Sequence, residues 1–570
     1  MKLRYLHLED EAPLQNITIP FGQETVLGRN CAIRFVVGVN GSGKSRLLRA
    51  LTQLFLALEL KPDKNPPFPV TLVYDLAYHP ETGDAYPRTI FLHYAGRGSD
   101  CIWRAHQPAP NPPVPFTDPA DWNTYLQTVP EIPVSAYGQK STFFLPRTVL
   151  AYSSGLSRDW ETLFAPAHNT TTVEQAELSE ERPPHWSMTQ EIQYLLSTEP
   201  ELAQPLIEAQ EKLDPERYTL WENETETGYF VSAPILKLAL CAVALHQARQ
   251  DLPATAGEQE EEAIRQRVRA ALVNQKAQSG LRGLLDEVGW LWPVTVTLTL
   301  DPTHVAKGKL RQWETIYALF QVNATLKLME PDPSQAETFI FDLYNTLDRD
   351  DKDNRVLAAL IDAFLPGEPV TAFTIFRQLY RWHTAGYLRE LTMSLQKEGV
   401  DDLLLYDWLS DGEQLFLGRM ALFHLLQEEQ DALLIFDEPE THFNDVWKRR
   451  IVDIIDDSLR DQHHEVIIST HSSIALTDVF DTEITVLKNG VATRPAVRTF
   501  GASPSQLMIY LFNAPDSMGQ RAMEYLDAQL DRTWTAHDIP ELDNLLENLA
   551  AGYHRAELRA IRNRLNVAQD

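Results

Sequence analysis

Cysteine and positive charge are both scarce in this chain. Of its 570 residues only three are cysteines (Cys31, Cys101 and Cys241), and they are widely spaced and odd in number. No disulfide framework and no cysteine-based zinc site fits that count, so a reducing cytoplasm is the natural environment. Lysine and arginine number 50 against 80 acidic residues, which leaves a formal charge of −30. This acidity argues against general binding along a nucleic-acid backbone, although a local basic groove remains possible because net charge does not describe its distribution.

Long apolar runs are also missing. The longest, near Ile235–Leu245 and Ala432–Phe436, fall well short of the roughly 18–20 residues that a membrane-spanning helix requires. The amino-terminal stretch Met1–Asp10 alternates apolar and polar side chains and carries acids, unlike a signal peptide. No heptad pattern persists, so a long coiled coil is not expected. We therefore predict a soluble, cytoplasmic protein with no membrane contact.

The hydropathy pattern predicts two α/β regions, separated by a region in which helices dominate. Near the amino terminus we expect strands at Lys2–Glu9, Leu14–Phe21 and Ile33–Val37, a helix at Ser45–Leu60, a hairpin of Val70–Ala77 with Thr89–Tyr94, and a strand at Arg147–Tyr152. In the middle, helices are expected at Met188–Leu196, Ala233–Gln250 and Glu260–Ala277, with strand-like alternation in Pro293–Leu300 and Thr325–Leu343. Later we expect strands at Leu403–Trp408, Ala432–Asp437 and Val466–Thr470, and helices at Glu413–Gln427 and Val446–Asp457. The last 70 residues look helical and polar.

A glycine-rich segment follows the strand predicted at Ile33–Val37. It reads Gly38-Val39-Asn40-Gly41-Ser42-Gly43-Lys44-Ser45, which matches the full phosphate-binding loop between a strand and a helix. Its glycines let backbone N–H groups turn toward phosphate oxygens, and the helix amino terminus favours the negative charge. Lys44 can reach the β- and γ-phosphates of ATP, and the Ser45 hydroxyl can ligate Mg²⁺. The segment predicts an ATP–Mg²⁺ site.

A second apolar strand, Ala432–Phe436, leads into two acids and a proline. Asp437 ends this strand, where α/β folds place ligand chemistry, and can hold Mg²⁺. Glu438 can accept a proton from an attacking water. Two acids in such a place can also be a helix cap, but the phosphate-binding loop favours the catalytic interpretation. Glu440 is the weaker candidate base because it lies further from the strand tip.

Two further motifs flank Asp437. Upstream, Leu409-Ser410-Asp411-Gly412-Glu413-Gln414 offers Ser410 and Gly412 as an anion-binding nest at a helix start. Downstream, Ile467-Ile468-Ser469-Thr470-His471-Ser472 places His471 just beyond a buried strand. In this order the four motifs resemble those of ABC-type ATPase heads of the SMC and RecF-like branch.

That resemblance implies an α/β fold with an ABC-type P-loop ATPase head, a mixed sheet flanked by helices, a large, mainly helical insertion and a helical C-terminal tail. It divides the chain into 1–160 (ATPase lobe with the phosphate-binding loop), 161–400 (insertion), 401–500 (ATPase lobe with signature, Walker B and switch histidine) and 501–570 (helical segment). It implies that two heads pair head-to-tail, so that Ser410 and Gly412 act on ATP bound at Lys44 of the other copy. It further implies that His471 contacts the γ-phosphate.

The sequence departs from that family in two places. The glutamine loop is not recognisable, and Gln139 is its best candidate. The segment Pro439-Glu440-Thr441-His442-Phe443 resembles the overcoming-lysogenization-defect (OLD) branch, whose enzymes attach a Toprim nuclease after the head. Because no Asp-x-Asp pair follows His471, a fused Toprim nuclease is not expected.

Two short stretches, residues 147–157 and 499–504, resemble segments of AAA-annotated ATPases from bacterial anti-phage islands, such as the Septu and retron-associated ATPases. This resemblance implies an ATPase that regulates a separate effector, such as a nuclease, in phage defence. Ordinary strand-to-loop structure explains both stretches equally well. A DNA repair or chromosome-maintenance ATPase of the RecF and SMC kind is the alternative, and a nucleotide-switched scaffold with little turnover is a third. The acidic charge disfavours the second hypothesis, and the candidate base Glu438 disfavours the third.

Overall fold

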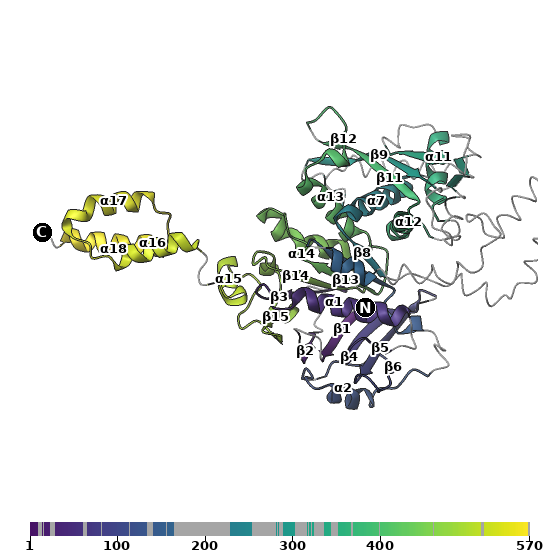
Figure 1. Ribbon diagram of the computed structural model, residues 1–570, viewed down its shortest axis with the longest axis horizontal. Coiled ribbons are helices and arrows are strands. Elements are labelled where there is room, and N and C mark those ends of the chain that lie inside the picture. Colours follow the sequence, from purple (N-terminus) through teal and green to yellow (C-terminus); the bar gives the residue numbers. More distant parts are fainter. Residues whose placement is uncertain are drawn as a thin grey trace, which may run out of the picture.

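The computed structural model describes most of the chain outside three stretches near residues 165–227, 253–288 and 302–335. The described residues are 1–9, 14, 16–22, 29–60, 65–80, 82–112, 114–133, 141–155, 157–164, 228–252, 281, 283, 285, 289–301, 316, 319–320, 322–323, 336–343, 351–365, 369–397, 399–459, 461–514 and 518–567. Figure 1 shows the two α/β lobes stacked around helix α1, with a separate group of helices at the carboxyl end.

A seven-stranded sheet forms the centre of the molecule. Its strands run in the order β16-β15-β3-β14-β13-β7-β8, and all except β16 are parallel. Their bounds are Ala32–Val37 (β3), Thr148–Ser153 (β7), Gly228–Val231 (β8), Ala432–Asp437 (β13), Glu465–Thr470 (β14), Ile484–Lys488 (β15) and Val491–Thr493 (β16). Parallel strands buried on both faces read as continuous apolar runs, which is why β3, β13 and β14 were recognisable in the sequence.

Strand order brings distant parts of the chain to one edge. β14 lies between β3 and β13, with Thr470 opposite Val37 and Ser469 opposite Asp437. Since parallel strands end at the same edge, the turns that follow β3, β13 and β14 are neighbours.

A second sheet, antiparallel and five-stranded, packs against the other side of α1 (Lys44–Leu60). Its order is β2-β1-β4-β5-β6, with bounds Lys2–Leu8 (β1), Ile17–Pro20 (β2), Val70–Tyr78 (β4), Ala85–Tyr94 (β5) and Ile102–His106 (β6). The β4–β5 pairing confirms the predicted hairpin. Leucines along α1 share one buried cluster with β1, β4 and the face of β13, so α1 is sandwiched between the two sheets.

The amino terminus is anchored to the later lobe. The Met1 ammonium lies 2.5 Å from Oδ1 of Asp431, and the Leu3 backbone N–H donates to Oε2 of Glu465 at 2.9 Å. The two halves of the ATPase region therefore form one folded unit despite their separation in sequence.

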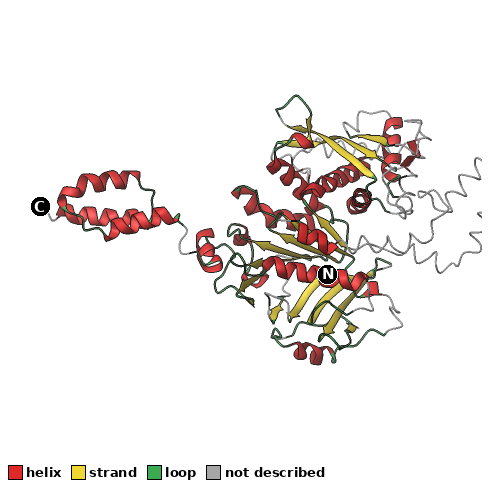
Figure 2. Cartoon of the chain, in the orientation of Figure 1, coloured by secondary structure: helices red, strands yellow, loops and turns green. Residues whose placement is uncertain are grey.

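The described part of residues 161–400 is not only helical. Its helices are α7 (Leu236–Asp251), α11 (Asp351–Asp362) and α12 (Ala372–Ala385). An antiparallel sheet in the order β10-β9-β11-β12 accompanies these helices. Its strands are β9 (Trp290–Leu300), β10 (Glu337–Asp342), β11 (Leu388–Lys397) and the short β12 (Leu404–Leu405), which lies just beyond residue 400. Figure 2 shows this sheet in yellow beside the red helices.

Strands β9 and β10 lie where the sequence predicted strand-like alternation within the insertion, and they alternate apolar and polar residues as half-buried strands do. Two other sequence expectations need revision. β8, inside the predicted insertion, is an edge strand of the ATPase sheet. Residues 406–408, predicted as the end of a strand, form a 3₁₀ turn after β12. The helices expected at 188–196 and 260–277 lie outside the described residues.

Four helices close the chain, as the sequence predicted. They are α15 (Pro504–Phe512), α16 (Gln520–Asp531), α17 (Ile539–Asn548) and α18 (Tyr553–Val567). The last three share a small core of their own, built on Leu526, Trp534, Leu542 and Leu558. None of the helices in the described parts of the chain has the length and apolar character needed to cross a bilayer.

Candidate nucleotide-binding and catalytic site

The glycine-rich loop after β3 adopts backbone conformations that require glycine. Gly38, Gly41 and Gly43 have φ angles of 157°, 79° and 100°. A Cβ at Gly38 would lie 2.4 Å from the Leu487 carbonyl oxygen and 2.6 Å from Oγ of Ser42, so a larger residue cannot fit there. Asn40 and Gly41 are exposed, whereas Ser42 is buried with no hydrogen-bond partner for its hydroxyl in the described structure. The backbone of this loop can therefore surround an anion, and the Ser42 hydroxyl is available to donate a hydrogen bond to it.

Lys44 begins helix α1 and is folded back over this loop. Its Nζ donates to the carbonyl oxygens of Gly38 at 3.1 Å and Val39 at 3.4 Å. Burial lowers the pKa of Lys44, and the nearby carboxylates of Glu438, Asp437 and Glu440 oppose that shift. The cation is thus held at the loop and among the acids that follow β13.

Ser45 and Asp437 meet as the sequence predicted for a Mg²⁺ site. The Ser45 hydroxyl donates to Oδ1 of Asp437 at 3.1 Å, and the Ser469 hydroxyl donates to the same oxygen. Burial raises the pKa of Asp437, and these two hydrogen bonds act against the rise. A hydroxyl beside a carboxylate fits Mg²⁺, which takes few protein oxygens and completes its shell with phosphate and water.

Glu438 and His471 form a pair at the same edge. Nε2 of His471 lies 3.0 Å from Oε1 of Glu438, and both side chains are about one-third exposed. The hydrogen bond from His471 is the main cause that lowers the pKa of Glu438, so the carboxylate is ionised at neutral pH. Glu438 has a left-handed φ of 53°, held by its N–H donating to the backbone oxygen and Oγ of Ser469, both at 3.1 Å.

Ser410 and Gly412, the predicted signature residues, lie at the start of helix α13 (Asp411–His424). Ser410 is the N-cap, and its hydroxyl donates to Oε2 of Glu413 at 2.8 Å in a capping box. Gly412 is exposed, and a Cβ added there would meet no atom of a described residue within 4 Å. In the described structure, neither residue hydrogen-bonds to the group formed by Lys44, Ser45, Asp437, Glu438 and His471. The candidate glutamine-loop residue Gln139 lies outside the described residues.

Sequence reasoning missed the buried Arg419 on α13. Its Nη1 donates to the carbonyl oxygens of Pro439, at 2.9 Å, and Thr441, and its Nε donates to the Tyr152 hydroxyl at 2.6 Å. Only 1% of Arg419 is exposed. The signature helix is therefore tied directly to the turn that carries Glu438. A lone arginine inside an apolar helical run was the only signal available.

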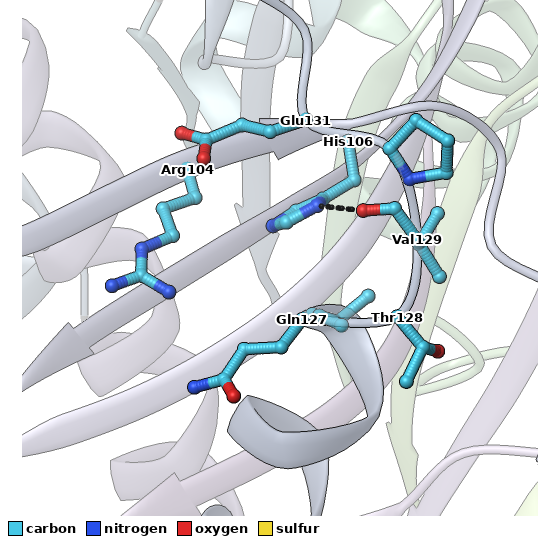
Figure 3. A pocket seen from close by; sticks show the side chains of 8 residues that line it. Arg104, His106, Gln127, Thr128, Val129 and Glu131 are labelled. Carbon is cyan, nitrogen blue, oxygen red and sulfur yellow. Dashed lines mark hydrogen bonds between the residues drawn. The ribbon is translucent and has the colours of Figure 1, made fainter.

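A hollow of about 380 Å³ lies elsewhere, at the outer strand β6 and the end of helix α2 (Pro119–Leu126). Figure 3 shows Arg104, His106, Gln127 and Glu131 around it, with His106 Nδ1 at 3.2 Å from the Val129 carbonyl oxygen. The residues that line this hollow include none of the predicted nucleotide-site residues.

A family model matches the part of the chain that contains several of the predicted site residues. Residues 326–478, which include Ser410, Asp437, Glu438 and His471, match a protein-family model described as "AAA domain, putative AbiEii toxin, Type IV TA system". No curated protein matches the chain.

Solved SMC heads also match over much of the chain. An SMC head domain from Thermotoga maritima is 12% identical, covers 87% of this chain and 100% of its own, and has a TM-score of 0.29. An Smc head with an extended coiled coil, bound to the C-terminal domain of ScpA and derived from Pyrococcus furiosus, is 11% identical, covers 87% and 96%, and scores 0.29. An SmcHead bound to the C-winged helix domain of ScpA is 10% identical, covers 87% and 98%, and scores 0.32.

The parallel sheet, the glycine loop before α1, and the acids and histidine at the same edge have the arrangement of a P-loop nucleotide site. Within residues 326–478, the chain resembles the AAA domain of the putative AbiEii toxin family.

Proposed function

We propose that this chain binds ATP with Mg²⁺ and hydrolyses it where β3, β13 and β14 end. The observation that carries the proposal is the pairing of Glu438 with His471 beside the carboxyl group of Asp437, next to the phosphate-binding loop. An ionised carboxylate at that place can act as general base, which a protein that only binds nucleotide does not need.

Each residue has a distinct role in the proposed reaction. Lys44 and the loop N–H groups hold the β- and γ-phosphates, and Ser45 with Asp437 would hold Mg²⁺. When bound, Mg²⁺ would neutralise part of the negative charge on the phosphate oxygens. Glu438 takes a proton from water while the water oxygen bonds to the γ-phosphorus. The bond from that phosphorus to the bridging oxygen breaks, and ADP leaves with the electron pair. His471 orients Glu438 and contacts the γ-phosphate.

The basic test is release of phosphate from ATP by the purified chain. We expect Mg²⁺-dependent release that is abolished by excess EDTA and restored by added Mg²⁺. Absence of release under all conditions, with ATP shown to bind, would contradict turnover and favour the nucleotide-switched scaffold.

We further propose that two copies pair head-to-tail, so that Ser410 and Gly412 complete the site of the partner. Ser410 is exposed, and the space around Gly412 is open among the described residues, so their packing does not explain a glycine there. A helix amino terminus with small residues suits a phosphate brought to it from outside.

The output of this ATPase is proposed to be control of a separate effector, such as a nuclease, in phage defence. The support is the AbiEii-type family match and the acidic composition, which suits protein contact better than contact with DNA. Gel filtration with the products of neighbouring genes tests it, and co-elution with a nuclease is expected. Salt-sensitive DNA binding by the isolated chain would instead favour a DNA-maintenance role.

A further inference from the structure

Glu440 occupies a buried position between the two turns of the catalytic edge. It lies two residues after Glu438, and only 5% of it is exposed. Its Oε1 accepts hydrogen bonds from the Thr470 hydroxyl and from the His471 backbone N–H, the latter at 3.3 Å. Its Oε2 is buried and has no hydrogen-bond partner in the described part of the chain.

These contacts make Glu440 unsuited to be the base that activates water. One carboxyl oxygen is engaged by two donors, and the other is shielded from solvent. Burial also raises the pKa of Glu440, which favours its neutral form. A neutral acid still accepts hydrogen bonds through its carbonyl oxygen.

The same contacts connect Glu440 to the histidine that touches Glu438. Glu438 meets the ring of His471 at 3.0 Å, whereas Glu440 holds the backbone of that residue. The Glu438 N–H is bonded in turn to Ser469, so three successive residues of the β14 end, Ser469, Thr470 and His471, are tied to the turn after β13. Loss of the Glu440 contacts would free the His471 backbone while leaving the ring chemistry intact.

We propose that Glu440 is a positioning residue for ATP hydrolysis, which fixes the His471 backbone so that its ring stays against Glu438. The expected effect of Glu440 on kcat rests on the proposed function, whereas its hydrogen bond to the His471 backbone N–H does not. In this proposal Glu440, the second glutamate of the Asp437-Glu438-Pro439-Glu440 segment, positions His471 and does not take the proton from water.

A double-mutant cycle tests the kinetic side. Glu440→Leu removes the acceptor, and kcat should fall by about 10²-fold with little change in KM, because small misplacements of catalytic groups cost that much. If Glu440 acts only through His471, the Glu440→Leu/His471→Ala double variant should be no slower than His471→Ala alone. Glu440→Gln keeps a carbonyl acceptor and should regain a large share of the rate lost in Glu440→Leu. If the double variant instead loses kcat by the product of the two single-variant factors, the two residues act independently and the proposal is overturned.

Hydrogen–deuterium exchange tests the hydrogen bond between Glu440 and the His471 backbone N–H, and it does not require ATP turnover. The peptide covering residues 466–474 should exchange faster at the His471 amide in Glu440→Leu than in the parent, and Glu440→Gln should retain most of the protection. Glu483→Gln, a buried glutamate bonded to Arg29, is the matched control and should leave this peptide unchanged. Unchanged exchange in Glu440→Leu overturns the proposal. A parent that fails to hydrolyse ATP contradicts the proposed function instead, and the exchange data still decide the role of Glu440.

Discussion

Nε2 of His471 lies 3.0 Å from Oε1 of Glu438, although the two residues belong to turns that follow different strands. They meet because β13 and β14 are adjacent and parallel, with Asp437 opposite Ser469. The histidine therefore contacts the candidate base directly, and its hydrogen bond is the main cause of the lowered pKa of Glu438.

This contact predicts a pH effect. Because the pKa of Glu438 is lowered, its carboxylate stays ionised as the pH falls below the usual glutamate range of about 4.3, and loss of activity from its protonation comes only at lower pH. His471→Ala removes the largest lowering cause, while burial of Glu438 still raises its pKa. The acid limb of kcat should therefore move to higher pH in His471→Ala. Steady-state rates measured from about pH 3.5 to about pH 8 check this, because that range extends below the usual glutamate pKa of about 4.3. If the acid limbs of the two normalised profiles superimpose, the coupling between His471 and Glu438 is contradicted.

Lys44→Ala should weaken ATP binding strongly. It removes the buried ammonium that faces the loop carbonyls and would neutralise the phosphates. Isothermal titration with ATP measures the affinity, and Lys448→Ala, at a lysine paired with Asp445 on α14 (Asp445–Leu459), is the control. Unchanged affinity in folded Lys44→Ala would rule out the phosphate-loop assignment.

The site at this edge of the sheet could be predicted from the sequence only in part. Gly38–Ser45, Asp437, Glu438 and His471 could be assigned because their motifs are local and follow apolar strands with a buried pattern. The tie from Glu440 to Thr470 and His471 depends on the order of strands, which local patterns do not specify. The contacts of Arg419 depend on how α13 packs against the turn after β13. The sheet of β9, β10 and β11 was only partly recognised, because its strands lie far apart in the sequence.

Ser410→Arg should leave ATP binding by each copy intact and block hydrolysis, because a bulky cation would obstruct closure of the partner site. Mixing this variant with Lys44→Ala gives mixed dimers with one site damaged at both positions and one free of both changes. Partial recovery of ATPase activity on mixing is expected if subunits exchange and one site can fire alone. No recovery in proven mixed dimers would point to obligatory coupling between sites or against the head-to-tail arrangement.

Arg419→Met should lower both stability and kcat. The substitution keeps apolar volume but leaves the carbonyl oxygens of Pro439 and Thr441 without their donor, at about 1–3 kcal/mol for each buried group. The turn that carries Glu438 would also lose its link to α13. Thermal unfolding and steady-state kinetics measure the two effects. Arg498→Met, at an arginine that is 87% exposed, should change neither, and parent-like behaviour of Arg419→Met would show that the link is dispensable.

The central claim, that Glu438 is the general base of an ATP hydrolase, is tested most directly by single-turnover hydrolysis with Glu438→Gln. Asp437, Ser45 and Lys44 remain, so ATP should bind as in the parent. The amide cannot take the proton from water, and the rate should fall by about 10²–10⁴-fold. Light scattering on the same samples should show an ATP-bound assembly that persists until ATP is withdrawn. Hydrolysis at near the parent rate by folded, ATP-bound Glu438→Gln would contradict the account.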